Sequence, residues 1–268
     1  MLTFSQKITV MCFAASFGTA LALELWHMYR PRPILRLIAL GFAGAGLLAQ
    51  VIYLIVQPVP LGSPTGSLFF LALILAVFYV GETIHHQRIV WALFVLPVVL
   101  ILIGLGVLVQ GRSATQTPES LGDFWVWIHI ILLLLASVGI SIGFIASVMY
   151  LVQLRRLQAK LPPSQGLLLF NLERLELMNR RAILGSFPLL TVGLLIGVIL
   201  QFSKGVEDWL SLRVLSVAGL WIVFAVLLYL RYRVHVRGRQ LALWTMFAFV
   251  ILVLALVSSH DFNQGGVP

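Results

Sequence analysis

The chain has 268 residues, of which 60% are hydrophobic and 10% are charged. A soluble fold cannot keep that much apolar surface out of water, so the composition excludes a soluble globular protein and indicates an integral membrane protein. The net charge of +9 is attributed to lysines and arginines that fix the membrane topology, and we expect no nucleic-acid partner. The single cysteine, Cys12, excludes a disulfide framework and a cysteine-based metal site.

Long continuous apolar runs predict an all-α fold, a polytopic membrane bundle of about eight transmembrane helices. In chain order the predicted spans are 5–29, 33–56, 66–86, 89–110, 124–152, 182–203, 211–231 and 240–259. Each is near the ~20 residues that a crossing needs. The first run continues through Leu25 without a suitably placed cleavage site, so we expect a membrane span there and not a signal peptide.

Charge is distributed unevenly between the connections. Most of the 18 lysines and arginines fall in the first, third, fifth and seventh connections. The positive-inside rule therefore predicts that these connections are cytoplasmic and that both termini lie outside. The sequence divides into a four-helix membrane region at 1–120, a core at 121–262 and a tail at 263–268 that we expect to be disordered.

The predicted span 124–152 contains one strongly titratable side chain, His129, close to its start. On a helix of about 100° per residue, Ala136, Ile140, Gly143 and Ser147 lie within roughly 40° of it. A stripe with several small residues allows another helix to approach closely, so this face is predicted to contact protein and not lipid.

Two of the six histidines are predicted to share the outer membrane edge: His129 opens one span and His260 closes another. Two neutral imidazoles on opposite faces can hold haem iron, so the pair is a candidate set of axial ligands. Trp125, Trp127 and Trp209 are predicted near the same surface, where they fit either an aromatic belt or the wall of a ligand site.

Other polar features receive structural interpretations. Adjacent His85 and His86 point about 100° apart on a helix and cannot easily share one ion. Glu24 is expected to snorkel or to pair with a nearby arginine such as Arg30. Charged and apolar residues separate on opposite sides of 167–181, which predicts a short helix in the cytoplasmic interface, with a solvated connector as the alternative.

Three stretches together resemble the cytochrome c assembly protein family, in its CcsA and HemX branch. They read WIHIILLLLASVGISIGFIASVMYLVQL, ERLELMNRRAILGSFPLLTVGLLIGVIL and LWIVFAVLLYLRYRVHVRGRQLALWTMFAFVILVLALVSSH. The similarity extends from about Phe124 to His260, with a vaguer match in the first four spans. No single motif is diagnostic, and the order and spacing of the three stretches carry the resemblance.

The resemblance implies haem handling, with His129 and His260 at the positions of the family's two outer axial histidines. Family members that attach haem to apocytochrome c carry a tryptophan-rich loop between these histidines, and here only Asp208 and Trp209 are left of it. The family's two intramembrane histidines are replaced near Ala49–Gln50 and at Tyr229. These departures favour the shorter HemX-like branch, which is linked to haem biosynthesis and its regulation.

The expected function is therefore the binding or presentation of haem at the outer face of a bacterial inner membrane, in cytochrome c biogenesis or haem metabolism. No general acid–base constellation is visible, so an enzymatic role is expected only as a subunit of a haem lyase complex. Expected partners are membrane lipid and either a protein with a periplasmic domain or a soluble haem-biosynthesis enzyme. A haem-free regulator remains an alternative. So does a small-solute transporter, for which Pro97 and Pro188 interrupt helices but no repeat is visible.

Overall fold

The computed structural model describes residues 9–30, 32–57, 59–85, 91–110, 124–160, 170–203, 212–229 and 238–257. These ranges form eight α-helices and no strand: α1 (Val10–Tyr29), α2 (Pro33–Val56), α3 (Pro64–His85), α4 (Ala92–Gln110), α5 (Phe124–Gln158), α6 (Leu172–Ser203), α7 (Leu212–Tyr229) and α8 (Gly238–Val257). Within the described ranges, seven helices are long and apolar enough to cross a membrane, and α7 contributes a shorter apolar stretch, Val214–Tyr229. The all-helical membrane fold predicted from composition is confirmed.

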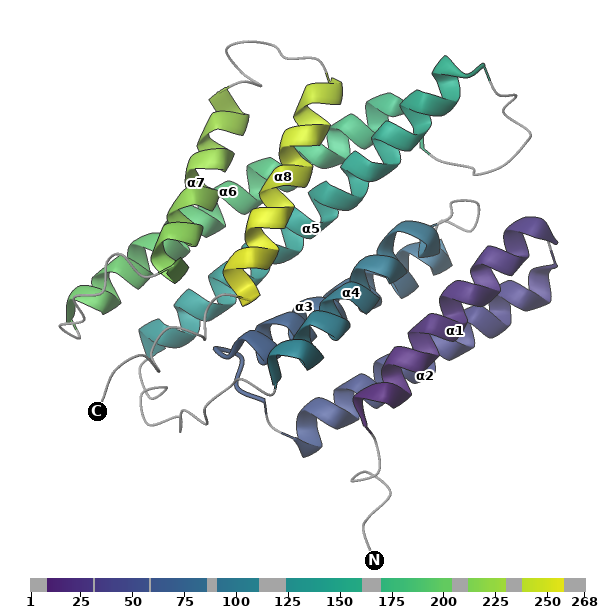
Figure 1. The fold of residues 1–268 in the computed structure, drawn as a ribbon, viewed down its shortest axis with the longest axis horizontal. Coiled ribbons are helices and arrows are strands. Elements are labelled where there is room, and N and C mark those ends of the chain that lie inside the picture. Colours follow the sequence, from purple (N-terminus) through teal and green to yellow (C-terminus); the bar gives the residue numbers. More distant parts are fainter. Residues whose placement is uncertain are drawn as a thin grey trace, which may run out of the picture.

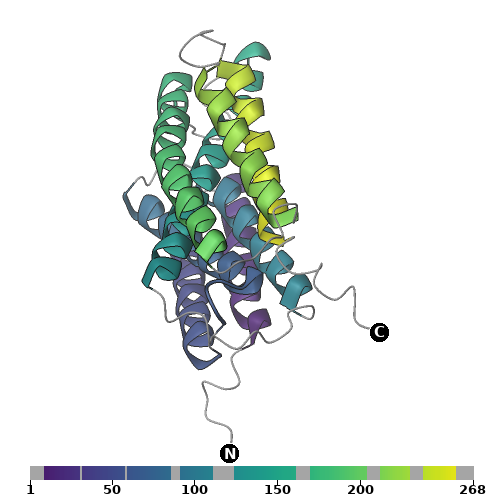
Figure 2. The same ribbon diagram turned by 90° about the vertical axis from the view of Figure 1, so that its left-hand side faces the viewer.

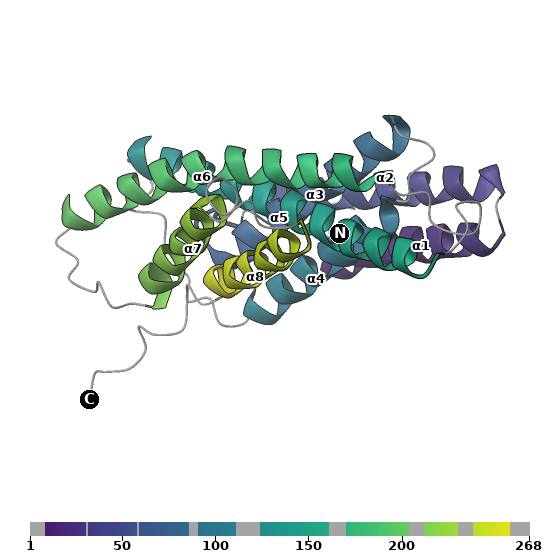
Figure 3. The ribbon, with the colours of Figure 1, turned by 90° about the horizontal axis from the view of Figure 1, so that it is seen from above.

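The helices form antiparallel pairs that lie beside one another (Figure 1). Helix α1 packs on α2 and α4, and α3 packs on α4, which gives an N-terminal half. Helix α5 packs on α6 and α8, and α7 packs on α6 and α8, which gives a C-terminal half. The view from above shows α6 running along one side of the bundle while α7 and α8 lie on the other (Figure 3).

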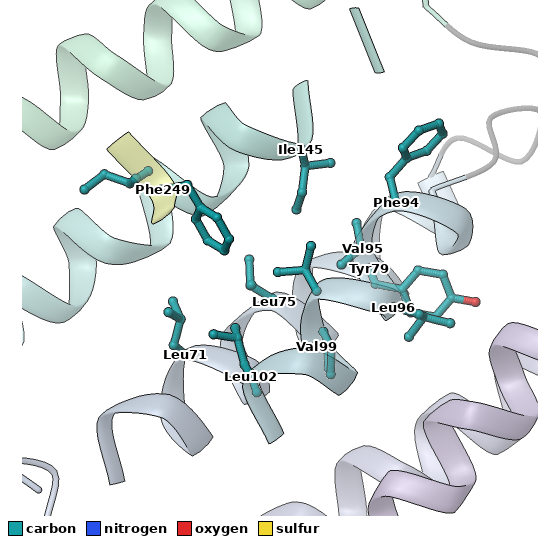
Figure 4. Packing of buried hydrophobic residues seen from close by; sticks show 14 of the residues in the cluster. Leu71, Leu75, Tyr79, Phe94, Val95, Leu96, Val99, Leu102, Ile145 and Phe249 are labelled. Carbon is teal, nitrogen blue, oxygen red and sulfur yellow. The ribbon is translucent and has the colours of Figure 1, made fainter. Parts of the chain in front are cut away.

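The two halves meet where α3 and α4 contact α5 and where α3 contacts α8. Leucine and valine side chains of α3 and α4 fill this junction against Ile145 of α5 and Phe249 of α8 (Figure 4). Helix α4 is apolar on every side, and more than half of the residues in its most apolar stretch are buried. This is expected for a helix that lies between other helices. Side chains that face outward are mostly large and apolar, as lipid contact requires.

The most extensive contact between two described helices, that of α5 with α6, depends on small residues on the His129 face. Ala136, Ile140 and Ser147 are buried there. A side chain at Gly139 would collide with the Ser186 hydroxyl of α6, and one at Gly143 would lie 3.3 Å from Ala182 Cβ. The prediction that this face contacts protein is confirmed, because only small residues permit such a short distance between helices.

A buried polar network ties three helices of the C-terminal half together. Asn179 Nδ2 of α6 donates to Ser147 Oγ of α5 at 2.7 Å, and Thr245 Oγ1 of α8 donates to Asn179 Oδ1 at 3.3 Å. All three side chains are buried. The network satisfies polar groups that would otherwise be costly within a membrane bundle.

Two expectations about helix boundaries are wrong. The stretch predicted as a separate interfacial helix at 167–181 instead forms the first turns of α6 from Leu172 onward, and its earlier residues 167–169 lie outside the described ranges. Asn171 starts the helix, because its Oδ1 accepts the backbone N–H of Arg174. Pro97 and Pro188, which were expected to interrupt helices, lie inside α4 and α6, and both helices continue through them. The side view shows α6 running along the length of the C-terminal half (Figure 2).

Candidate functional site

His129 lies in the second turn of α5, against the backbone of α6. Its Nδ1 is 2.7 Å from the carbonyl oxygen of Gly193. A carbonyl oxygen can only accept a hydrogen bond, so Nδ1 carries the proton and the lone pair of the neutral ring is on Nε2. Metal-binding histidines are commonly oriented in this way, by donating one ring N–H to a backbone carbonyl.

The close approach of the imidazole to α6 depends on two glycines spaced four residues apart. A Cβ atom at Gly197 would lie 2.6 Å from His129 Cε1 and 3.1 Å from Nδ1. A Cβ atom at Gly193 would lie 3.0 Å from Leu133 Cδ2. A side chain at position 197 would displace the imidazole ring, and one at position 193 would displace Leu133. Gly193 and Gly197 therefore form the backbone surface on which His129 packs.

A small cavity of about 90 Å³ adjoins the histidine. It is lined by residues of the Pro60–Pro64 connection and of α3, α5, α6, α7 and α8, and its polar groups come from His129, Ser67 and Ser137. The cavity shows that the start of α3, the start of α5 and the end of α8 lie at one end of the molecule. It has room for water-sized molecules, whereas pockets that enclose drug-sized ligands measure about 300–1,000 Å³.

The two tryptophans before His129 occupy different sides of α5. Trp125 lies one turn before His129 and about 40° from it on the helix, and 59% of its side chain is exposed. Trp127 is 39% exposed and lies about 160° from His129. Helical geometry therefore brings Trp125 to the side of the histidine and turns Trp127 away from it.

The remaining predicted site residues, Asp208, Trp209 and His260, lie outside the described residues. In the sequence, Asp208 and Trp209 follow the end of α6, and His260 follows the end of α8. Helix α8 contributes Ala255 and Leu256 to the cavity beside His129. Among the described residues, no group of three or more histidine, cysteine, aspartate or glutamate side chains could hold a metal ion.

The positions where the resemblance leads us to look for intramembrane histidines, near Gln50 and at Tyr229, carry no imidazole. Gln50 is fully buried in α2, and its Nε2 donates to the carbonyl of Phe69 at 3.0 Å. Aromatic rings of Phe13, Tyr53 and Phe69 pack against one another nearby, with centroids 5.6–6.0 Å apart. Tyr229 is exposed at the end of α7. In the N-terminal half, packed aromatic rings thus surround the region of Gln50.

Glu24 was expected to snorkel or to pair with a nearby arginine, and the arginine that interacts electrostatically with it is Arg36 of α2. Glu24 is buried, and its Oε1 accepts a hydrogen bond from Tyr79 Oη of α3 at 3.4 Å. Arg30 follows the last turn of α1 and lies on the chain where it leaves the helix. The interaction partner comes from a helix 55 positions away, which sequence spacing along α1 could not indicate.

Sequence reasoning also missed Gly193 and Gly197, although their four-residue spacing was a usable signal. Glycines four apart lie on one face of a helix and mark a surface where another helix or a ring can touch the backbone. Which side chain would lie on that surface depends on how α5 and α6 pair, and the spacing alone does not specify that.

Fold and site together define a polytopic helical membrane protein with an oriented histidine at one end of its C-terminal half. Residues 61–265 match the family model described as Cytochrome C assembly protein. The chain belongs to this family.

One curated relative is Protein HemX of Bacillus subtilis (strain 168), 26% identical over 146 residues. The match covers 54% of this chain and 52% of HemX, so the chain spans about half the length of that relative. No solved structure matches the chain. Family membership and the HemX match confirm the resemblance found in the sequence.

Proposed function

We propose that this protein binds or presents haem at the outer face of a bacterial inner membrane, with His129 and His260 as the axial ligands. The single observation that carries the proposal is the hydrogen bond from His129 Nδ1 to the Gly193 carbonyl, which orients the imidazole and makes Nε2 the proposed iron-binding atom. Membership of the Cytochrome C assembly protein family supports haem as the cofactor. The activity belongs to cytochrome c biogenesis or to haem metabolism.

The described residues fit one of the two axial ligand positions of haem. His129 supplies an imidazole, and Trp125 supplies an exposed aromatic surface one turn away. The cavity of about 90 Å³ is too small to enclose a macrocycle, so His129 would hold haem outside the cavity. Haem bound in this way supplies redox-active iron, and the residues of this chain hold and orient it.

His260 is the proposed second ligand because of its place in the chain. It follows Leu256, which lines the same cavity as His129, by four residues. Four residues of extended chain span at most about 14 Å, which keeps His260 within reach of the site. Asp208 and Trp209, which follow α6, are the proposed further wall of this site, and Trp127 is assigned to the aromatic belt or to the outer rim.

A titration of the detergent-purified protein with haemin tests the function. We expect one haem per chain and an absorbance spectrum with a Soret band and low-spin features in both oxidised and reduced protein. A protein that takes up no haemin in detergent and in lipid nanodiscs would contradict the proposal. The fold would then support the alternative of a haem-free regulator that contacts a soluble enzyme through the charged start of α6, residues 173–181.

The contact of His129 with Gly197 gives a second test of the haem site. Replacing Gly197 with alanine places a Cβ atom 2.6 Å from His129 Cε1, so the ring must move and its bond to Gly193 is lost. Removing such an orienting contact typically weakens metal binding by about 10- to 100-fold, and we expect that loss of haem affinity. Gly185→Ala on the same helix is the matched control, because a Cβ atom there meets nothing within 4 Å. Equal affinities of the two variants would show that the ring orientation is irrelevant.

A further inference from the structure

A buried polar cluster lies between α1, α2 and α3, at the end of the molecule opposite His129. Glu24 is 7% exposed, and Tyr79 and Thr83 are also buried. The phenol ring of Tyr79 packs with the apolar residues of α3 and α4, while its hydroxyl points away from them (Figure 4). This hydroxyl is directed toward Glu24, whose carboxyl oxygen it contacts.

Glu24 has few partners for a buried carboxyl group. Its contact with Tyr79 Oη measures 3.4 Å, whereas O–H···O hydrogen bonds are usually about 2.5–3.0 Å long. Arg36 of α2, the nearby cation, donates instead to the carbonyl oxygen of Thr83 at 3.2 Å. An ionised carboxylate offers about four acceptor sites, so one long hydrogen bond leaves it poorly compensated in a membrane interior.

Two more polar atoms beside this carboxyl have no hydrogen-bond partner among the described residues. They are Nδ1 of His27, one turn after Glu24 on α1, and Oγ1 of Thr83, one turn after Tyr79 on α3. Both atoms are buried. Buried polar atoms are normally satisfied, and a polar site with several such atoms is where an internal water molecule binds, commonly with about three hydrogen bonds.

We propose that Glu24, His27, Tyr79 and Thr83 form a hydrated proton-exchange site in the N-terminal half. Water bridges His27 Nδ1 and Thr83 Oγ1 to the carboxyl group of Glu24. A proton passes from solvent at the end of α1, through His27 and this water, to a carboxylate oxygen of Glu24, and it returns by the same route. As the water gives one proton to Glu24 it takes one from protonated His27, so an N–H bond breaks at His27, an O–H bond forms at Glu24 and the water is unchanged. No oxidation or reduction takes part.

Three of the helices around Glu24 carry the titratable and charged groups near it. Helix α1 provides His27, α2 provides Arg36, and α3 provides Tyr79 together with Glu82 and His85 near its end. The described residues of α4 include no titratable side chain. Protonation of Glu24 removes the only buried carboxylate charge among these groups, and such intramembrane acids serve as proton relays in membrane proteins. The site is independent of haem, because His129 lies at the other end of the bundle.

Infrared difference spectroscopy across a pH titration of the full-length protein in lipid tests the site. We expect one protonated-carboxyl C=O band that appears reversibly on acidification and shifts in deuterium oxide. The band should be lost in Glu24→Gln and kept in Glu82→Gln, the matched control, whose carboxyl group lies on α3 and is less buried. The band should also be the same in sodium, potassium and choline salts.

A second variant protects the test against misfolding of Glu24→Gln. Tyr79→Phe removes the hydroxyl that contacts Glu24, so the band should persist at a shifted frequency. A band that is unchanged in Glu24→Gln would overturn the proposal. So would a Glu24 carboxyl group that stays in one protonation state throughout the titration, or a response that depends on the salt cation.

Discussion

Replacing His129 with alanine should abolish the low-spin, six-coordinate haem spectrum expected from the proposed bis-histidine site. The substitution removes the imidazole that the Gly193 carbonyl orients, and no other described residue of the cavity beside it carries an imidazole. One remaining ligand would leave a five-coordinate, high-spin haem or none. His260→Ala should give the same spectral change, because each histidine occupies one axial position in the proposed site.

Absorbance and magnetic circular dichroism of the purified variants measure this change. The control is His85→Ala, which removes an exposed histidine from the opposite end of the bundle and should leave the spectrum unaltered. Added imidazole should restore the low-spin spectrum of His129→Ala, because the truncated side chain leaves space next to Gly197. A wild-type spectrum in His129→Ala would eliminate His129 as a ligand while leaving the family assignment intact.

The membrane fold could be predicted because lipid imposes a simple requirement on sequence. Every span must satisfy its backbone internally and present about 20 apolar residues, so composition alone locates the helices. The predicted helix boundary was wrong at the membrane surface, where the requirement for apolar residues no longer applies. Residues from Leu172 onward carry charges, yet they continue α6, since charged residues can face the interface from one side of a long helix while Leu175 and Asn179 are buried on the other.

The candidate site was only partly predictable for a related reason. His129 was identified because an ionisable residue inside an apolar run is rare and its helical face is rich in small residues. Its contact with Gly193 and the contact of Glu24 with Tyr79 depend on which helices are neighbours. Hydropathy treats all spans as equivalent and therefore contains no information on that choice.

Asn179→Ala should lower the free energy of unfolding by about 1–3 kcal/mol, because it removes two interhelical hydrogen bonds and leaves a void between α5, α6 and α8. Ser147 and Thr245 would keep their bonds to backbone carbonyls, so the loss should come from the contacts between helices. Reversible unfolding in mixed detergent micelles measures the change. A helical variant that unfolds with wild-type stability would contradict it.

A double-mutant cycle separates this network from a general effect of mutating α6. Asn179→Ala and Ser147→Ala should be non-additive by about 1 kcal/mol, because each single substitution already removes the 2.7 Å bond between them. Asn171→Ala is the matched control on the same helix: it removes the N-terminal cap of α6 and should add to Ser147→Ala. The cycle therefore tests whether α5 and α6 are held together by this specific pair, which also fixes the pairing that brings Gly193 to His129.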